Sequence, residues 1–134
     1  MEVSFFYVIF VVEIKTNTVM TTDEKMLLIE DLCCRLPFGV KASTKVGSNI
    51  IVSFIGCDTI IGEDGDSYDI SFITPYLFHL SSMTKKQEKE WRYTLSSDGN
   101  ITYDTVDWCN ENHFDYRGLI PMGLAIDATG LNIY

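Results

Sequence analysis

The sequence predicts an α+β fold in a single domain: an N-terminal helix, an antiparallel meander of three or four strands, and two or three short C-terminal helices. Apolar residues recur at helical spacing across residues 23–36, and residues 40–73 then switch to β-branched and aromatic types broken by glycine-rich turns. A chain of 134 residues has the size of one domain, and no stretch rich in Pro, Gly or Ser separates a second one.

The first helix is predicted across residues 23–36. Thr21 and Glu24 have the spacing of a capping box, and Pro37 with Gly39 ends the helix because proline cannot continue its hydrogen-bond ladder. The apolar positions are Met26, Ile29, Cys33 and Leu36, with Leu28 and Leu32 beside them, and the polar positions are Glu24, Lys25, Glu30, Asp31 and Arg35.

The meander is predicted as strands at residues 40–46, 49–55, 58–61 and 68–73. The third is the weakest, since it is also consistent with an extension of the second beyond a bulge at Gly56. In the second strand, alternation predicts that Ile50, Val52 and Phe54 point inward, while Ile51, Ser53 and Ile55 point outward. That outward face is still partly apolar, so we expect something to cover it. Pro75 is expected to end the last strand and begin a loop.

Shorter helices are predicted in the C-terminal half. Thr84 caps a polar helix that runs from residue 85 to about residue 93, with Trp91 as its anchor. A third helix is expected from near Thr105 to residue 112, and a fourth short one from Asp115 or Tyr116. Residues 124–128 have the composition of a short edge strand.

Residues 1–19 require a separate interpretation. The apolar run at residues 3–12 has about half the length of a membrane-spanning helix, and it has neither the basic leader nor the cleavage site of a signal peptide. Two alternatives stay open: an extra strand, or an incorrectly assigned start whose true position is Met20 or Met26. Residues 20–134 are then the α+β domain.

Charge and cysteine content limit the possible partners. Ten basic residues against nineteen acidic ones give a net charge of −9, which repels phosphate backbones and anionic lipids, so we expect no nucleic acid and no membrane as partner. An acidic decoy that imitates nucleic acid toward a DNA-binding protein remains an alternative. The four cysteines, Cys33, Cys34, Cys57 and Cys109, show no paired spacing, which favours reduced thiols and a cytoplasmic location.

Motifs for catalysis or metal binding are weak. Asp64, Asp66 and Asp69 lack the spacing of a calcium loop and match turn chemistry instead. Cys109, His113 and Asp115 have the residue types of a nucleophile, base and orienter, so a small thiol or metal-dependent enzyme is the alternative hypothesis. The chain has no phosphate-binding glycine loop and no GxSxG elbow, and we therefore predict no catalytic residue, no metal and no cofactor.

The densest local signal lies at residues 108–117. Trp, Tyr and Arg dominate binding hot spots, so the candidate partner-binding residues are Trp108, His113, Asp115, Tyr116 and Arg117. The same side chains also suit a structural corner between two helices, with Asp115 as a cap and Arg117 paired to a carboxylate. Of the two interpretations, we favour the structural one.

The chain from about residue 20 onward resembles a family of short uncharacterised proteins of Bacteroides-type gut bacteria and their phages. The resemblance is carried by EDLCCRLPFGVK, ITPYLFHLSSMTKKQEKEW and, most specifically, DWCNENHFDYRGLIPMGLAIDA. Residues 1–19 fall outside it, and the chain has ATGLNIY where the family has a more acidic, proline-containing tail. The resemblance implies phage or mobile-element provenance and no catalytic residue.

From these observations we expect a protein that binds another protein without catalysis. The expected contact surface is either the covered sheet or the segment at residues 108–117.

Overall fold

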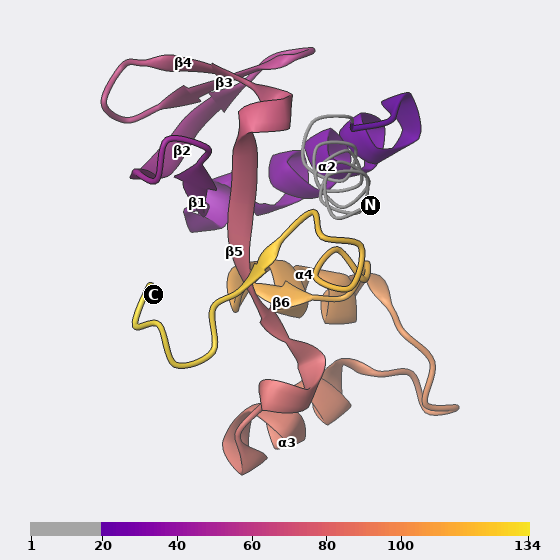
Figure 1. Ribbon diagram of the computed structural model, residues 1–134. Helices are drawn as coiled ribbons and strands as arrows, with labels where there is room; N and C mark the ends of the chain where they lie inside the picture. The colour runs from indigo at the N-terminus through magenta and orange to yellow at the C-terminus, as the bar shows by residue number, and fades with distance from the viewer. Residues whose placement is uncertain (1–19) are drawn as a thin grey trace, which may run out of the picture.

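The computed structural model describes residues 20–134, which form an α+β fold (Figure 1). Helix α2 (Thr22–Arg35) precedes all described strands of the sheet, and α3 (Lys85–Thr94) and α4 (Tyr103–Glu111) follow its fifth strand. The expected extra strand or incorrect start at residues 1–19 lies outside the described residues. Among residues 20–134, no helix is long and apolar enough to cross a bilayer.

Two capping boxes start helices where the sequence predicts them. The Thr21 hydroxyl accepts from the Glu24 amide, and the Glu24 carboxylate accepts from the Thr21 amide, both at 3.1 Å. Thr84 and Gln87 form the equivalent pair at the start of α3. A short 3₁₀ turn, η1 (Leu36–Phe38), follows α2 and ends at Gly39, whose φ of 81° favours a residue without a side chain.

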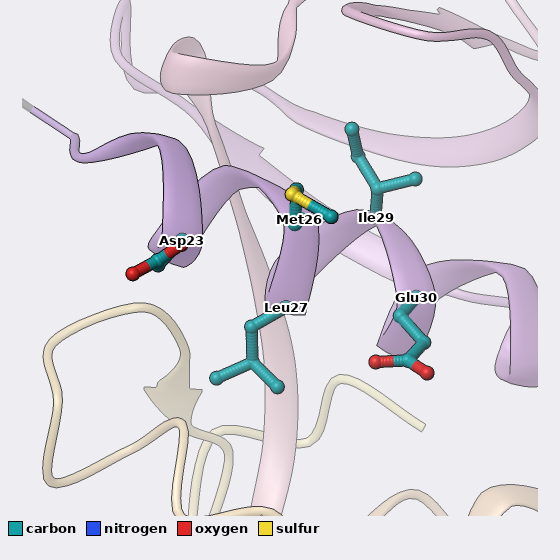
Figure 2. Close-up of a pocket in the computed structure, with 5 residues that line it drawn as sticks. All are labelled: Asp23, Met26, Leu27, Ile29 and Glu30. Atoms are coloured by element: carbon teal, nitrogen blue, oxygen red, sulfur yellow. The ribbon is translucent and has the colours of Figure 1, made fainter.

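The prediction for the buried face of α2 is wrong in part. Leu28 and Leu32 are buried as expected, but so are Asp31 and Arg35, which the sequence places on the polar face. Met26 is exposed on the opposite side of the helix (Figure 2). Burial of the two charged side chains is possible because they neutralise each other one helical turn apart.

The meander forms, within a larger sheet. Strands β1 (Lys41–Thr44), β2 (Asn49–Ile55), β3 (Thr59–Gly62) and β4 (Ser67–Asp69) pair antiparallel in sequence order. Strand β5 (Ile73–His79) pairs antiparallel with β1 and parallel with β6 (Phe114–Asp115) and β7 (Ile126–Asp127). The described sheet therefore has seven strands and is mixed, which corrects the prediction of a purely antiparallel sheet of three or four.

The expected loop after Pro75 is instead part of β5. Pro75 pairs with Ala42 of β1, while β7 and β6 join β5 only from Tyr76 and Phe78 onward. The proline thus has a neighbouring strand on one side, where a sheet tolerates a residue without an N–H group. Two 3₁₀ turns bound β5, namely η2 (Ile70–Phe72) and η3 (Leu80–Ser82).

A bulge changes which side chains of β2 face the core. The register between β2 and β3 shifts between Val52 and Phe54, and the Ser53 hydroxyl there donates to Ile61 O at 3.1 Å. Ile50 and Val52 point inward as predicted, but Phe54 is 57% exposed and Ile55 packs against the core. The bulge lies at Ser53 rather than at the predicted Gly56, and one extra residue reverses the alternation that follows it.

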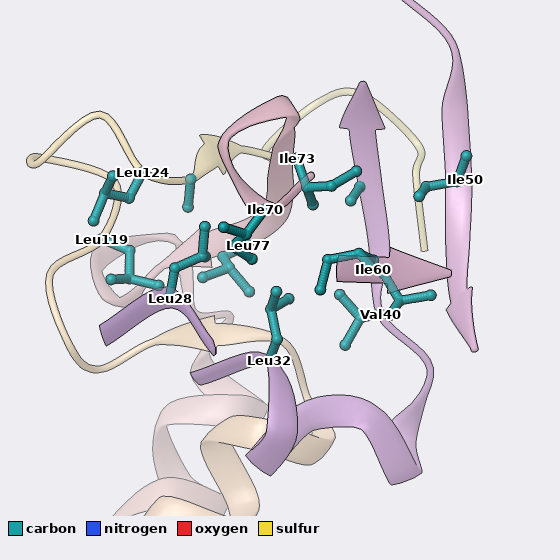
Figure 3. Close-up of a cluster of buried hydrophobic side chains, with 13 residues drawn as sticks. Leu28, Leu32, Val40, Ile50, Ile60, Ile70, Ile73, Leu77, Leu119 and Leu124 are labelled. Carbon is teal, nitrogen blue, oxygen red and sulfur yellow. The ribbon is translucent and has the colours of Figure 1, made fainter. Parts of the chain in front are cut away.

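The core lies between α2, the sheet and the C-terminal loop (Figure 3). Leu28 and Leu32 of α2 meet β3 and β5 there, and Leu119 and Leu124 of the loop close it. The fully buried strand and turn residues of this cluster are Ala42, Ile60, Ile70 and Leu77. Residues from both ends of the described chain are thus needed to bury β5.

The C-terminal helices number two, within the predicted two or three, but the second of them starts earlier than expected. Thr102 caps α4, which begins at residue 103 rather than near Thr105. The predicted fourth helix does not form, since residues 116–125 adopt bends and turns interrupted by Gly118 and Gly123 at positive φ. Strand β7 confirms the expected short strand within residues 124–128.

Candidate functional site

Arg35 connects the end of α2 to the segment predicted as a binding site. Its Nε donates to Asp31 Oδ2 at 2.8 Å, its Nη2 to Phe114 O at 2.7 Å, and its Nη1 to Cys109 O at 3.4 Å. The two carbonyl acceptors belong to the end of α4 and to β6. One buried guanidinium therefore connects α2, α4 and the sheet.

Tyr116 and Arg117 extend this network toward the surface. Two guanidiniums lie over the Tyr116 ring, with Arg35 Cζ 5.3 Å and Arg117 Cζ 5.1 Å from its centroid. Arg117 also approaches Asp31 at 3.3 Å and Glu30 at 3.5 Å, which agrees with the expected carboxylate pairing. Both side chains are thus engaged in internal contacts.

The other three predicted residues also make internal contacts. Trp108 stacks on Phe114 with ring centroids 5.4 Å apart. His113, at a left-handed φ of 64°, stacks on Tyr134 at 3.6 Å. The buried Asp115 carboxylate accepts from the Leu119 and Ile120 amides, each at 2.9 Å, so it caps a turn rather than a helix.

The titration of Cys109 and His113 does not suit thiol catalysis. Burial raises the pKa of Cys109 to about 11, although the Arg35 charge opposes that shift, so the group is a thiol at neutral pH. Burial, with the charges of Arg35 and Lys41, lowers the pKa of His113 to about 4. Both Asp115 oxygens accept backbone amides, which makes this carboxylate the cap of the turn at residues 115–120.

Metal-ligand geometry is likewise missing from the described part of the chain. Within residues 20–134, no group of three or more His, Cys, Asp or Glu side chains is arranged to hold an ion. Cys33, Cys34 and Cys57 are free and exposed, and Cys109 is free and buried.

A groove runs along the outer side of α2 (Figure 2). It is lined by Met26, Leu27 and Ile29, with the carboxylates of Asp23 and Glu30 toward its two ends. Between the two carboxylates, the lining is apolar.

The corner between α3 and α4 exposes large side chains that the sequence analysis did not identify. Tyr93 is 80% exposed, Ile101 64% and Tyr103 91%, and we call these three residues the corner patch. The Thr102 hydroxyl donates to Thr94 O at 2.7 Å, so the patch residues flank one hydrogen bond. Local sequence carries no signal for this patch, because exposure here depends on how α3 sits at the end of β5 (Figure 1).

Known proteins offer no counterpart. No protein-family model, no curated protein and no solved structure matches the chain. What the protein does is therefore inferred from its own surface and contacts.

Proposed function

We propose that the protein is a protein-binding module without catalysis and that the corner patch is its contact surface. The observation that carries the proposal is the joint exposure of Tyr93, Ile101 and Tyr103 beside one inter-helix hydrogen bond. Tyrosine is enriched among binding hot spots because it buries a large rigid ring and keeps a polar hydroxyl. Exposed side chains of this kind gathered at one place suit a partner that covers them.

The corner is held in place before any partner arrives. Thr94 O accepts from the Thr102 hydroxyl at 2.7 Å and from the Thr105 hydroxyl at 3.0 Å. Thr102 also caps α4, so the end of one helix and the start of the next share the same side chain. A surface ordered in this way loses less conformational entropy on binding, which favours affinity.

The predicted segment at residues 108–117 supports the proposal less well than the corner does. Its Trp108, Tyr116 and Arg117 side chains make ring and ion contacts within the molecule. A partner that used them would first have to replace those contacts. In contrast, Tyr103 stands almost fully in solvent.

Site-specific photo-crosslinking tests the proposal. A benzophenone amino acid replaces Tyr103 in one variant and Val46 in a control, because Val46 is 85% exposed and lies in the turn between β1 and β2. In the cells that make the protein, we expect a discrete crosslinked protein from position 103 and none from position 46. Absence of a crosslink from position 103, or equal products from both positions, would contradict the proposed surface.

A further inference from the structure

The corner patch joins two helices whose exposed side chains carry opposite charge. On α3, Lys85, Lys89 and Arg92 recur at intervals of four and three residues and therefore share one side of the helix. Lys86 is exposed next to them, so α3 carries four of the ten basic residues of the chain. The same helix contains Glu88, which pairs with Arg92 at 2.6 Å, and an exposed Glu90, which leaves α3 with a net positive charge.

The exposed face of α4 is acidic. Asp104, Asp107 and Glu111 follow intervals of three and four residues, so the three carboxylates lie on one side of the helix, and all are exposed. Thr105, Cys109 and Asn110 are the buried positions of this helix, and Thr105 and Cys109 lie opposite the three carboxylates. Along the chain, the basic residues of α3 thus precede the corner patch and the acidic residues of α4 follow it.

The positive charge on α3 is unusual within this acidic protein. Arg35 is buried against Asp31, Arg117 is paired with Asp31 and Glu30, and the Lys41 ammonium donates to Ile133 O at 2.7 Å. These cations are engaged in internal contacts, whereas the α3 lysines are exposed. With a net charge of −9, two copies of the molecule repel each other at long range. Association between copies therefore depends on local complementarity of charge.

We infer that the partner of the corner patch is a second copy of this chain. Rotation by a two-fold axis through the patch places basic α3 of each copy opposite acidic α4 of the other, while the apolar centres meet. When two copies of a surface with the order basic, apolar, acidic meet in opposite directions, each basic part faces an acidic part. The inference rests on the proposed function and names its partner. Because each copy contributes only the three residues of the corner patch to the centre of the interface, we expect a reversible dimer with a Kd of about micromolar order.

Charge reversal tests this arrangement. The first variant carries Lys85→Glu and Lys89→Glu, and the second carries Asp104→Lys and Asp107→Lys, all at exposed positions. In sedimentation equilibrium we expect a dimer for the wild type and a monomer for each variant alone. An equimolar mixture restores the dimer, because the acidic α3 of the first then faces the basic α4 of the second, and the acidic α4 of the first faces the basic α3 of the second.

Three outcomes of the charge-reversal experiment would overturn the inference. They are a wild type that stays monomeric up to about 1 mM, a dimer that survives both reversals, and a mixture that stays monomeric. Far-ultraviolet circular dichroism of each variant, expected to match the wild type, shows that the reversals leave the fold intact. Removal of the centre by Ile101→Ser with Tyr103→Ser is expected to weaken dimerisation at least about tenfold; unchanged dimerisation in this variant contradicts the inference.

Failure of the inference and failure of the proposed function give different results. A monomeric wild type whose position 103 crosslinks to a different protein overturns self-association and keeps the binding function. A monomeric wild type without any crosslink removes both. A crosslinked species with twice the mass of the chain supports both.

Discussion

Arg35 donates from Nε to Asp31 Oδ2 at 2.8 Å, and neither side chain has any solvent-exposed surface. The remaining donors of the guanidinium reach carbonyl groups at Phe114 and Cys109, some eighty residues further along the chain. This contact places a buried ion pair, with three hydrogen bonds from the guanidinium, where a Leu or Met would otherwise fill the space. Its value to the fold depends on both partners being present.

Removal of one partner is expected to be more costly than removal of both. Arg35→Met leaves Asp31 buried with only the longer contact to Arg117, and we expect the free energy of unfolding to fall by about 3 kcal/mol. Asp31→Leu combined with Arg35→Met leaves no uncompensated charge between them and should lose less than the single variant. Urea denaturation measures both. A double variant less stable than Arg35→Met would contradict this account.

Asp115 is expected to stabilise the turn after β6. Asp115→Ala leaves two amides without an acceptor, those of Leu119 and Ile120, and should cost about 3 kcal/mol in the free energy of unfolding. Asp115→Asn keeps one acceptor oxygen and serves as the matched control, with about half that loss. Equal stability of the two variants would mean that the carboxylate is not the cap.

The stability of the protein should fall in acid through His113. In the unfolded chain the pKa of a histidine is about 6.5, whereas in the fold that of His113 is lowered to about 4, so below pH 6.5 the unfolded state binds a proton that the fold does not. Stability therefore decreases between about pH 6.5 and pH 4, by about 1–2 kcal/mol because solvent screens this half-buried group.

The variant for this test is His113→Asn, because Asn tolerates the left-handed φ of 64° and does not titrate in this range. Urea midpoints of variant and wild type, measured at pH 7, 5 and 4, should converge as the pH falls. A constant difference across this range would show that His113 does not contribute to the acid sensitivity.

Cys109 should resist alkylation in the folded protein. Its raised pKa of about 11 and its burial reduce the thiolate fraction more than about a hundredfold relative to an ordinary thiol. With iodoacetamide at pH 8, peptide mass spectrometry should show labelling of Cys33, Cys34 and Cys57 first, and of Cys109 only on unfolding. Rapid labelling of Cys109 in the fold would revive the thiol-enzyme hypothesis.

The starts of α2 and α3 were predictable because their signals are local. Thr21 with Glu24 and Thr84 with Gln87 satisfy backbone groups within one turn, and four residues of sequence are enough to recognise each pair. The order of β1 to β4 was also predictable, since short turns join antiparallel neighbours.

The errors arise where distant partners decide the outcome. Strand β5 forms across Pro75 because β1, β6 and β7 supply its neighbours, and no local rule reveals a strand with such partners. The bulge at Ser53 reverses the direction in which the Phe54 side chain points. At this bulge the Ser53 hydroxyl donates to two carbonyl groups of β3, Ile61 O and Gly62 O.

The candidate site follows the same division. Residue types predicted a binding surface or a structural corner at residues 108–117, and in the structure the Tyr116 ring contacts the guanidiniums of Arg35 and Arg117. Sequence periodicity placed Arg35 on a polar face of the helix. Two charged side chains of opposite sign that lie one helical turn apart are most often exposed to solvent. Its burial depends on carbonyl groups from α4 and β6, which only the fold brings within reach.

The parallel pairing of β5 sets an order of assembly during synthesis on the ribosome. Strands β1 to β4 can pair with one another once residue 69 has emerged, but Tyr76 meets its partner only when Ile126 has been made. Until then, β5 (ITPYLFH) has one backbone edge unpaired. The side chains of Ile73 and Leu77, which the complete fold buries, are also exposed. A nascent chain stalled before residue 114 should therefore need a chaperone to stay unaggregated, although the completed fold does not.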